Sequence, residues 1–202
     1  INMAKEQVDG WISLFDGETL NGWGATGKDE GWVVDDGAIL CTVKGGQMLY
    51  SEEQFDNFIL SLEYMSEPKV NSGVFIRWAD LQRPVQTGIE IQILDTHGKE
   101  PATKHCCGAF YDAKEPTRNV CKPAGEWNEM IITCDDSILV VEMNGEEIVR
   151  ADLDDWDTPH KNPDGSRNKF GTALKDFPRK GHIGLQDHGG KLWFRNIKVK
   201  NL

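Results

Sequence analysis

The sequence predicts an all-β protein, built as a two-sheet antiparallel β-sandwich with long surface loops. Segments with apolar residues at every second position dominate the chain, which is typical of strands that bury one face. Asn144-Gly145 separates two of these segments, and this dipeptide is a strong hairpin signal. No segment keeps a 3.6-residue apolar period over three helical turns. Many strands at short spacing favour a sandwich.

The expected strands follow one another along a single domain, residues 1–202, in which residues 1–9 are a flexible N-terminal segment. Residues 31–43 hold two short strands around a turn at Asp35-Asp36-Gly37. The other strands are expected within 55–66, 71–78, 88–95, 108–112, 128–152 and 181–200.

Three polar segments separate these strands. Residues 79–87 and 96–106 are expected to be loops. Residues 153–180 are expected to form a longer surface loop with a helical turn near 172–177. Loops of this length in compact domains are often functional.

Composition excludes some partners. The net charge is −11, whereas nucleic acid and anionic membranes attract basic surfaces. No apolar run approaches the roughly 18–20 residues of a membrane span. The opening "INMAKEQVDGW" lacks a secretory signal pattern, so any export signal is expected to have been removed. Oligomeric state is left open.

The five cysteines leave two alternatives open. No C-x-x-C pair occurs, which argues against zinc or iron–sulfur ligation. Cys106 or Cys107 could form a loop-closing disulfide with Cys121 in an oxidising compartment. Alternatively, the cysteines are small buried residues.

Polar side chains share one face on three expected strands. By alternation, Asn71, Gly73, Phe75 and Arg77 lie on one side of 71–78, and Glu90 and Gln92 lie opposite three isoleucines in 88–95. His182, Gly184, Gln186 and His188 share a third face. An ordinary solvated face is the default interpretation. The mixture of Gln, His, Asn and glycine gaps instead favours a ligand-binding floor.

Two tryptophans border the loops. Trp78 and Trp156 could stack on a sugar ring, although large aromatic side chains are more often part of the core.

The order of the segments resembles a known family, the 3-keto-disaccharide hydrolase domain, formerly a domain of unknown function. The most specific matches are N-S-G-x-F-x-R at 71–77, E-x-Q-x-x-D at 90–95, G-x-I-x-L-Q-x-H at 181–188 and F-R-N-I at 194–197. Further matches include "GWISLFDGETLNGW" (10–23) and "GAFYD" (108–112), and together they cover nearly the whole chain.

The resemblance implies a concanavalin A-like jelly roll that acts on glycosides oxidised at sugar carbon 3. It also implies a bacterial, extracytoplasmic protein, located in the periplasm, at the cell surface or in the medium. A separate oxidase or dehydrogenase must then supply the keto-sugar. The loop 153–180 and "HCCG" (105–108) look particular to this chain and leave the exact substrate open.

The expected chemistry begins with loss of the acidified hydrogen on carbon 2, continues with expulsion of the aglycone from carbon 1 and ends with hydration. Glu90 and His188 are the candidate catalytic residues. His188 is the preferred proton-transfer group because histidine titrates near neutrality. Candidate substrate-binding residues are Asn71, Arg77, Trp78, Gln92, Asp95, Tyr111 and Gln186.

Two other functions compete with this hypothesis. A carbohydrate-binding module would use the same polar floor without a base. A two-carboxylate hydrolase is suggested by Glu90-x-Gln92-x-x-Asp95, which resembles the E-x-D-x-x-E signature of β-glucanases, but Gln92 replaces the central acid.

The chemistry requires no cofactor, and no metal site is assigned. Structural calcium could bind acidic loops such as Asp35-Asp36, Asp135-Asp136 or Asp152–Asp155. These residues are more often plain turns.

Overall fold

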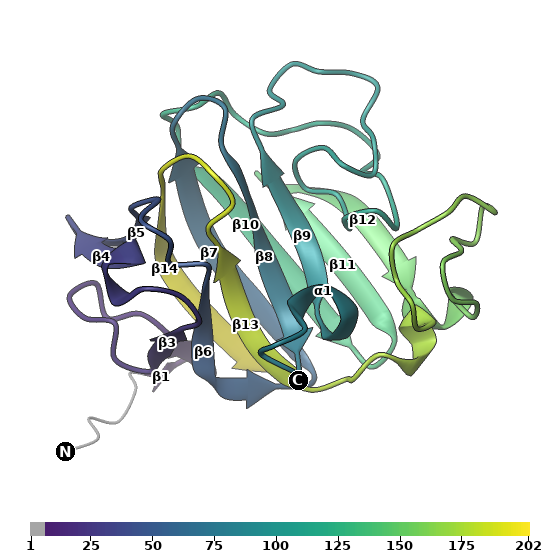
Figure 1. The fold of residues 1–202 in the computed structure, drawn as a ribbon, viewed down its shortest axis with the longest axis horizontal. Helices are drawn as coiled ribbons and strands as arrows, with labels where there is room; N and C mark the ends of the chain where they lie inside the picture. The colour runs from purple at the N-terminus through teal and green to yellow at the C-terminus, as the bar shows by residue number, and fades with distance from the viewer. Residues whose placement is uncertain (1–6) are drawn as a thin grey trace.

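The computed structural model describes residues 7–202 and shows two stacked antiparallel sheets (Figure 1). The front sheet in Figure 1 has five strands. In spatial order they are β3 (Trp23–Ala25), β6 (Met48–Phe55), β13 (Gly181–Gln186), β8 (Asn71–Trp78) and β9 (Ile89–Leu94). Their outer face points toward the viewer and carries the polar residues discussed below.

The sheet behind it has nine strands. The main path runs through β1 (Gln7–Val8), β2 (Trp11–Ser13), β14 (Leu192–Asn201), β7 (Phe58–Ser66), β10 (Asn128–Asp135), β11 (Ile138–Met143) and β12 (Glu146–Asp152). The branch comprises β5 (Ala38–Cys41), which pairs with β14, and β4 (Trp32–Asp35), which pairs with β5. Two antiparallel sheets confirm the predicted sandwich.

Helical structure is short throughout the described residues. It comprises α1 (Pro84–Thr87) and the 3₁₀ turns η1 (Asp29–Gly31), η2 (Leu153–Asp155) and η3 (Leu174–Asp176). The turn η3 agrees with the helical turn expected near 172–177. None of the described helices is long and apolar enough to cross a membrane.

A single large core lies between the sheets. Alternation in β9 points its isoleucines inward, and β13 adds Ile183 and Leu185. These side chains belong to the same buried cluster as Leu60 and Leu62 of β7 in the opposite sheet. Burial of this apolar surface is the main force that holds the two sheets together.

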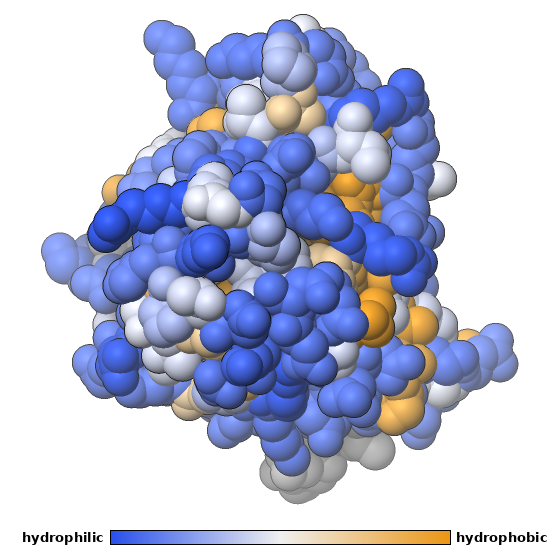
Figure 2. All heavy atoms as spheres, turned by 90° about the vertical axis from the view of Figure 1, so that its right-hand side faces the viewer, coloured by the Kyte–Doolittle hydropathy of each residue, from blue (hydrophilic) through white to orange (hydrophobic). Residues whose placement is uncertain are grey.

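Trp156 also belongs to this core, where its indole nitrogen donates to Asn162 Oδ1 at 2.8 Å. A buried ring cannot stack on a sugar, so the packing alternative holds for Trp156. The loop 153–180 that follows β12 gives the molecule a largely hydrophilic side (Figure 2).

Most expected strands are present, but the short strands β2 and β3 fall outside the expected ranges, and three further details differ. The strand β6 was not expected, because its second half reads "SEEQF" and lacks clean alternation. Residues 108–112 form an isolated bridge between Ile91 and Phe110 instead of a strand. The expected flexible segment 1–9 is too long, since Gln7–Val8 pair with β2, while residues 1–6 lie outside the described residues.

All five cysteines are buried, and none forms a disulfide. The alternative of small buried residues therefore describes this structure.

Candidate functional site

Glu90 and Gln92 lie side by side on the outer face of the five-stranded sheet. Their strand, β9, sends its isoleucines into the core, so strict alternation leaves the two polar side chains on the other face. Both are nevertheless buried, with Glu90 only 7% exposed. The site therefore holds a carboxylate largely shielded from water.

Gly73 of β8 makes room for this carboxylate. Phe75 pairs with Glu90 and Gly73 pairs with Gln92, so the Glu90 side chain leans diagonally over Gly73. A Cβ atom at position 73 would lie 2.7 Å from Glu90 Oε1 and 2.9 Å from its Cγ. The space beside Gly73, which was expected to hold a ligand, is thus filled by the Glu90 side chain.

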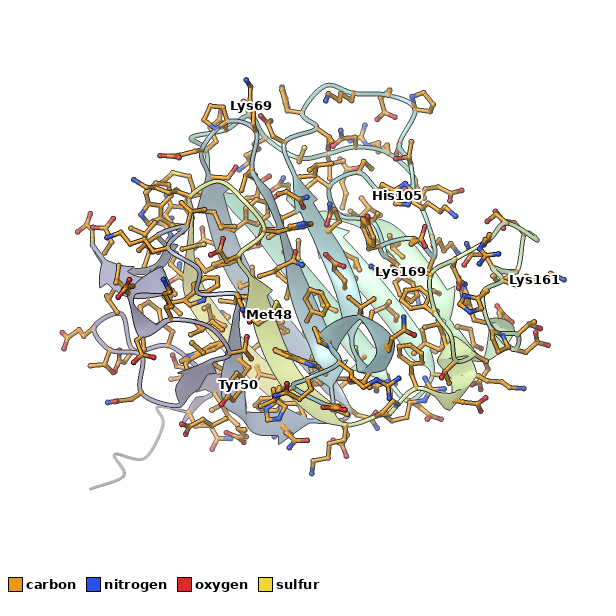
Figure 3. All side chains as sticks on the ribbon, in the orientation of Figure 1. Met48, Tyr50, Lys69, His105, Lys161 and Lys169 are labelled. Carbon is orange, nitrogen blue, oxygen red and sulfur yellow. The ribbon has the colours of Figure 1, made fainter. Side chains whose placement is uncertain are left out.

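Lys169 is the cation next to Glu90. Its Nζ lies 3.4 Å from Glu90 Oε2 and 4.0 Å from the centre of the Tyr111 ring, a distance typical of a cation–π contact. Figure 3 shows Lys169 and His105 beside β9, on the flank formed by the loops 95–127 and 153–180. Lys169 was missing from the predicted site.

Asp112 joins these two loops. Its Oδ2 accepts the Lys169 backbone N–H at 2.8 Å, and its Oδ1 lies 2.8 Å from His105 Nε2 and 3.6 Å from Lys104 Nζ. The backbone carbonyl of Asp112 accepts from Asn162 Nδ2 at 3.1 Å. Asp112 therefore fixes the backbone that presents Lys169 to Glu90.

The electrostatic setting of Glu90 suits proton exchange. Burial raises the pKa of its carboxyl above the ordinary value, and the positive charges of Lys169 and His188 oppose that rise. The same surroundings act on Tyr111, whose pKa is raised by burial and by the charges of Glu90 and Asp112. Glu90 therefore holds a proton more tightly than an exposed glutamate does.

Three amide side chains flank the carboxylate. In one orientation the Gln92 nitrogen donates to Asn71 Oδ1 at 3.3 Å. Turned over, it donates to Glu90 Oε1 at 3.3 Å and to the Ser72 carbonyl at 3.0 Å. Among the described residues, Gln186 Oε1 is buried without a hydrogen-bond partner. It can accept a hydrogen bond from a ligand hydroxyl.

His188 lies in the exposed turn between β13 and β14. Its charge is one of the influences on Glu90, which places the two groups within electrostatic reach of each other. His188 is thus a rim residue, whereas Glu90 is buried in the floor.

Arg77 does not lie on the polar floor where strand alternation placed it. Its φ of +50° and the register shift between His182 and Gly184 on the paired strand form a β-bulge. The bulge reverses the alternation, so Trp78 joins Phe75 on the outer face and Arg77 turns away.

The Arg77 guanidinium binds two turns instead. It donates to the carbonyls of Asp56 and Asp136, both at 2.7 Å, and to Asn57 Oδ1 at 3.0 Å. These acceptors lie in the turns β6–β7 and β10–β11, and Arg77 is 1% exposed. Its role in the described structure is to fasten turns.

The expected sugar contact of Trp78 is also wrong. It lies on the outer face with Met48 and Phe75, and Tyr50 and Leu81 pack against this cluster. Trp78 is 0% exposed, so its ring offers no free face for a sugar. Figure 3 shows Met48 and Tyr50 on the same front face, across the sheet from Lys169.

Asp95 does not pair with Glu90 on the floor. It follows the end of β9, and its Oδ2 accepts the Lys69 backbone N–H at 2.8 Å. No bulge is present within β9 to bring Asp95 onto the Glu90 face. The two-carboxylate pattern read from the sequence therefore lacks its second acid here.

Two of the acidic pairs lie in tight turns. Among residues 7–202, no group of three or more His, Cys, Asp or Glu side chains could hold a metal ion. Asp36 and Asp136 adopt φ of +45° and +49° in tight hairpin turns, which explains the acidic pairs as turn residues. The expectation that no metal is required stays a prediction.

Comparisons with known proteins add the family context. The sequence pattern of the family described as 3-keto-alpha-glucoside-1,2-lyase-like domain matches residues 10–200. A Bacteroides thetaiotaomicron protein named 3-keto-disaccharide hydrolase is 29% identical over 96% of this chain and 79% of its own length.

Solved structures agree with the fold. A candidate glycosyl hydrolase from Parabacteroides distasonis ATCC 8503 superposes with a TM-score of 0.85 at 33% identity, covering 95% of this chain and 99% of that one. The carbohydrate-binding module CBM66 from Bacillus subtilis has a TM-score of 0.56 at 11% identity, covering 89% and 96%. The latter likeness shows the fold alone.

Proposed function

The chain belongs to the 3-keto-alpha-glucoside-1,2-lyase-like domain family, and on that premise we propose that it cleaves glycosides carrying a ketone at sugar carbon 3. Family membership and the hydrolase relative support a glycosidase-type function. The route proposed is removal of the proton at carbon 2, elimination of the aglycone and addition of water.

The observation that carries this proposal is the contact between Glu90 and Lys169. In a 3-keto sugar the acidic hydrogen on carbon 2 is one bond away from the carbonyl carbon. Proton removal at carbon 2 places negative charge on the carbonyl oxygen, so a base and a cation are needed close together. Glu90 Oε2 and Lys169 Nζ, 3.4 Å apart, supply both groups.

Glu90 is the better base of the two candidates. Its burial raises its pKa, and a carboxylate with a raised pKa is a stronger proton acceptor. This reverses our preference from the sequence, which gave the proton transfer at carbon 2 to His188. The exposed position of His188 suits a different step, donation of a proton to the departing aglycone oxygen.

Glu90, His188 and water carry every proton that moves in this route. Glu90 takes the proton from carbon 2, and the resulting enolate is stabilised by Lys169. The enolate electrons return to form the double bond between carbons 1 and 2 as the bond to the aglycone breaks, and His188 gives the aglycone oxygen its proton. Water then adds to carbon 1, and Glu90 returns a proton to carbon 2 while His188 takes one from the water.

The amides around Glu90 provide hydroxyl recognition in this proposal. Gln186 Oε1, which is buried without a partner among the described residues, accepts from a sugar hydroxyl. Gln92 holds Glu90 through the orientation that donates to Oε1. Tyr111 supports Lys169 through its ring, a role distinct from the direct sugar contact predicted from the sequence.

Kinetics of two variants on a 3-keto-glucoside test this proposal. Glu90→Gln should lower kcat by about 100-fold or more, the usual contribution of a general base, and His188→Ala should lower it less when the aglycone is a good leaving group. Glu129→Gln, which changes an exposed glutamate in β10 of the other sheet, is the matched control. Full turnover by both site variants would sink the assignment.

The same assay separates the competing functions. Binding of the keto-sugar without release of the aglycone would indicate a carbohydrate-binding module. Release from ordinary glucosides at the same rate as from 3-keto-glucosides would indicate direct glycoside hydrolysis, for which Asp95 lies in the wrong place.

A further inference from the structure

Cys107 and Cys121 both lie against the Thr96 hydroxyl, at the two ends of the segment that carries Tyr111 and Asp112. The Thr96 hydroxyl accepts the Cys107 backbone N–H at 3.1 Å and lies 3.9 Å from Cys121 Sγ. Cys107 Sγ lies 3.0 Å from the Tyr64 hydroxyl. Thr96 therefore brings Cys107 and Cys121 to one buried spot, although 13 residues separate them in the sequence.

The two thiols are chemically unequal. Interaction with the Cys107 side chain lowers the pKa of Cys121 to about 7. The same interaction, together with burial, raises the pKa of Cys107 well above its usual range. A thiolate is the reactive form of cysteine, so Cys121 is the member of the pair that reacts first. It is also slightly more exposed, at 6% against 1% for Cys107.

The remaining cysteines are poorly placed for the same reaction. Cys106 Sγ points to the Cys107 carbonyl at 3.6 Å. Cys41 and Cys134 lie in strands of the nine-stranded sheet, and burial raises the pKa of each to about 12. The contacts at Thr96 thus favour Cys107–Cys121 among the alternatives left open by the sequence.

We propose that Cys107 and Cys121 form a reversible disulfide when the protein meets a small-molecule disulfide. The Cys121 thiolate attacks one sulfur of the small disulfide, forms a mixed disulfide and releases one small thiolate. Cys107 then loses its proton, and its sulfur attacks the Cys121 sulfur, which releases the second small thiolate. Two protein thiols are oxidised, one small disulfide is reduced, and the two thiol protons end on the released thiols.

The disulfide would affect the candidate functional site through residues 107–121, the segment whose ends it joins. Residues 107–121 include Tyr111, whose ring lies against Lys169, and Asp112, which accepts the Lys169 backbone N–H. A covalent link at the ends of this segment restricts its opening. Redox state then sets how firmly Lys169 is held beside Glu90.

Thiol counting tests the disulfide independently of any enzymatic activity. The folded protein is incubated with oxidised glutathione or with dithiothreitol, then denatured and alkylated, and its intact mass is measured. We expect all five cysteines to be alkylated after dithiothreitol, and three after oxidised glutathione.

Single serine variants identify the partners. Cys106→Ser is the matched control, adjacent in sequence, and should still lose two alkylated thiols on oxidation. Cys107→Ser and Cys121→Ser should form no intramolecular bridge. Five alkylated thiols in the oxidised wild type, or a bridge that survives Cys107→Ser and vanishes in Cys106→Ser, would overturn the proposal.

Thermal unfolding of the wild-type protein supplies a second test that does not depend on any substitution. Oxidation should raise Tm by roughly 6–12 °C, as expected for a bridge closing a loop of about 15 residues. Dithiothreitol should reverse the rise. An unchanged Tm with an intact bridge would contradict the proposed tightening of the loop.

Discussion

Lys169 Nζ lies 3.4 Å from Glu90 Oε2, although the two are 79 positions apart in the chain. The contact depends on three local features. Gly73 leaves space for the carboxylate, Tyr111 supports the ammonium group, and Asp112 holds the Lys169 backbone.

Lys169→Met should move the pH dependence of the reaction. The ammonium charge lowers the pKa of Glu90 against the rise caused by burial. Removing that charge raises the pKa further, so the rising limb of kcat/KM, where Glu90 loses its proton, should shift to higher pH. The maximal rate should also fall, because the enolate loses its cation.

The pH–rate profile of the variant on a 3-keto-glucoside measures this shift. Lys161→Met is the matched control, since Lys161 is an exposed residue of the same loop. An unshifted limb in Lys169→Met would mean that Glu90 is not the titrating base.

Gly73→Ala should displace the base without changing any chemical group. The new Cβ would lie 2.7 Å from Glu90 Oε1, closer than such contacts allow, so the carboxylate must move. We expect a loss of kcat of about 100-fold, the usual effect of misplacing a catalytic group by roughly 1 Å.

Gly171→Ala controls for a glycine substitution near the same site, because the nearest atom to its Cβ would be Gln86 Oε1 at an ordinary 3.5 Å. Circular dichroism and Tm confirm folding of both variants. Equal activity of Gly73→Ala and wild type would show that the position of Glu90 is unimportant.

Glu90→Gln should stabilise the protein while it lowers activity. The folded-state pKa of Glu90 is raised by burial, so the folded protein binds this proton more tightly than the unfolded chain does. The ionised form therefore costs stability at pH values above the folded-state pKa, and that cost disappears as the pH falls through this pKa.

Tm measured against pH for wild type and Glu90→Gln checks the sign. The variant should melt at a higher temperature at neutral pH, and the two curves should approach each other on acidification. A variant less stable than wild type at neutral pH would indicate that the ion pair with Lys169 outweighs the cost of burial.

Arg77→Met should affect stability more than substrate binding. Three acceptors in two turns would lose their charged donor, a cost of about 3 kcal/mol for buried groups left unpaired. Urea unfolding measures the loss, and the exposed Arg150→Met is the control. A raised KM with unchanged stability would instead show that Arg77 binds substrate.

Alternation along the strands predicted the part of the site that lies on regular strand. Glu90 and Gln92 share the outer face because β9 is uninterrupted. The same rule failed at Arg77, where a positive φ reverses the faces. No residue type in "FIRW" predicts that bulge, since arginine rarely adopts a positive φ.

Lys169 could not be located by strand periodicity, because it lies in an irregular loop and reaches Glu90 through tertiary contacts alone. The length and polarity of residues 153–180 marked the segment as functional, but no spacing rule singled out one lysine. Asp112 was missed for a related reason, since residues 108–112 were read as a strand and form a turn-rich loop instead.

The proposed elimination at carbon 2 is tested most directly by running the reaction in D₂O. Wild-type protein is incubated with a 3-keto-glucoside, and the released sugar is analysed by mass spectrometry and NMR at early conversion, alongside free 3-keto-glucose in buffer alone. The account predicts aglycone release with a single deuterium at carbon 2 of the product. No aglycone release at all, or release without deuterium at carbon 2 that is equally fast from a substrate already carrying deuterium at carbon 2, would contradict it.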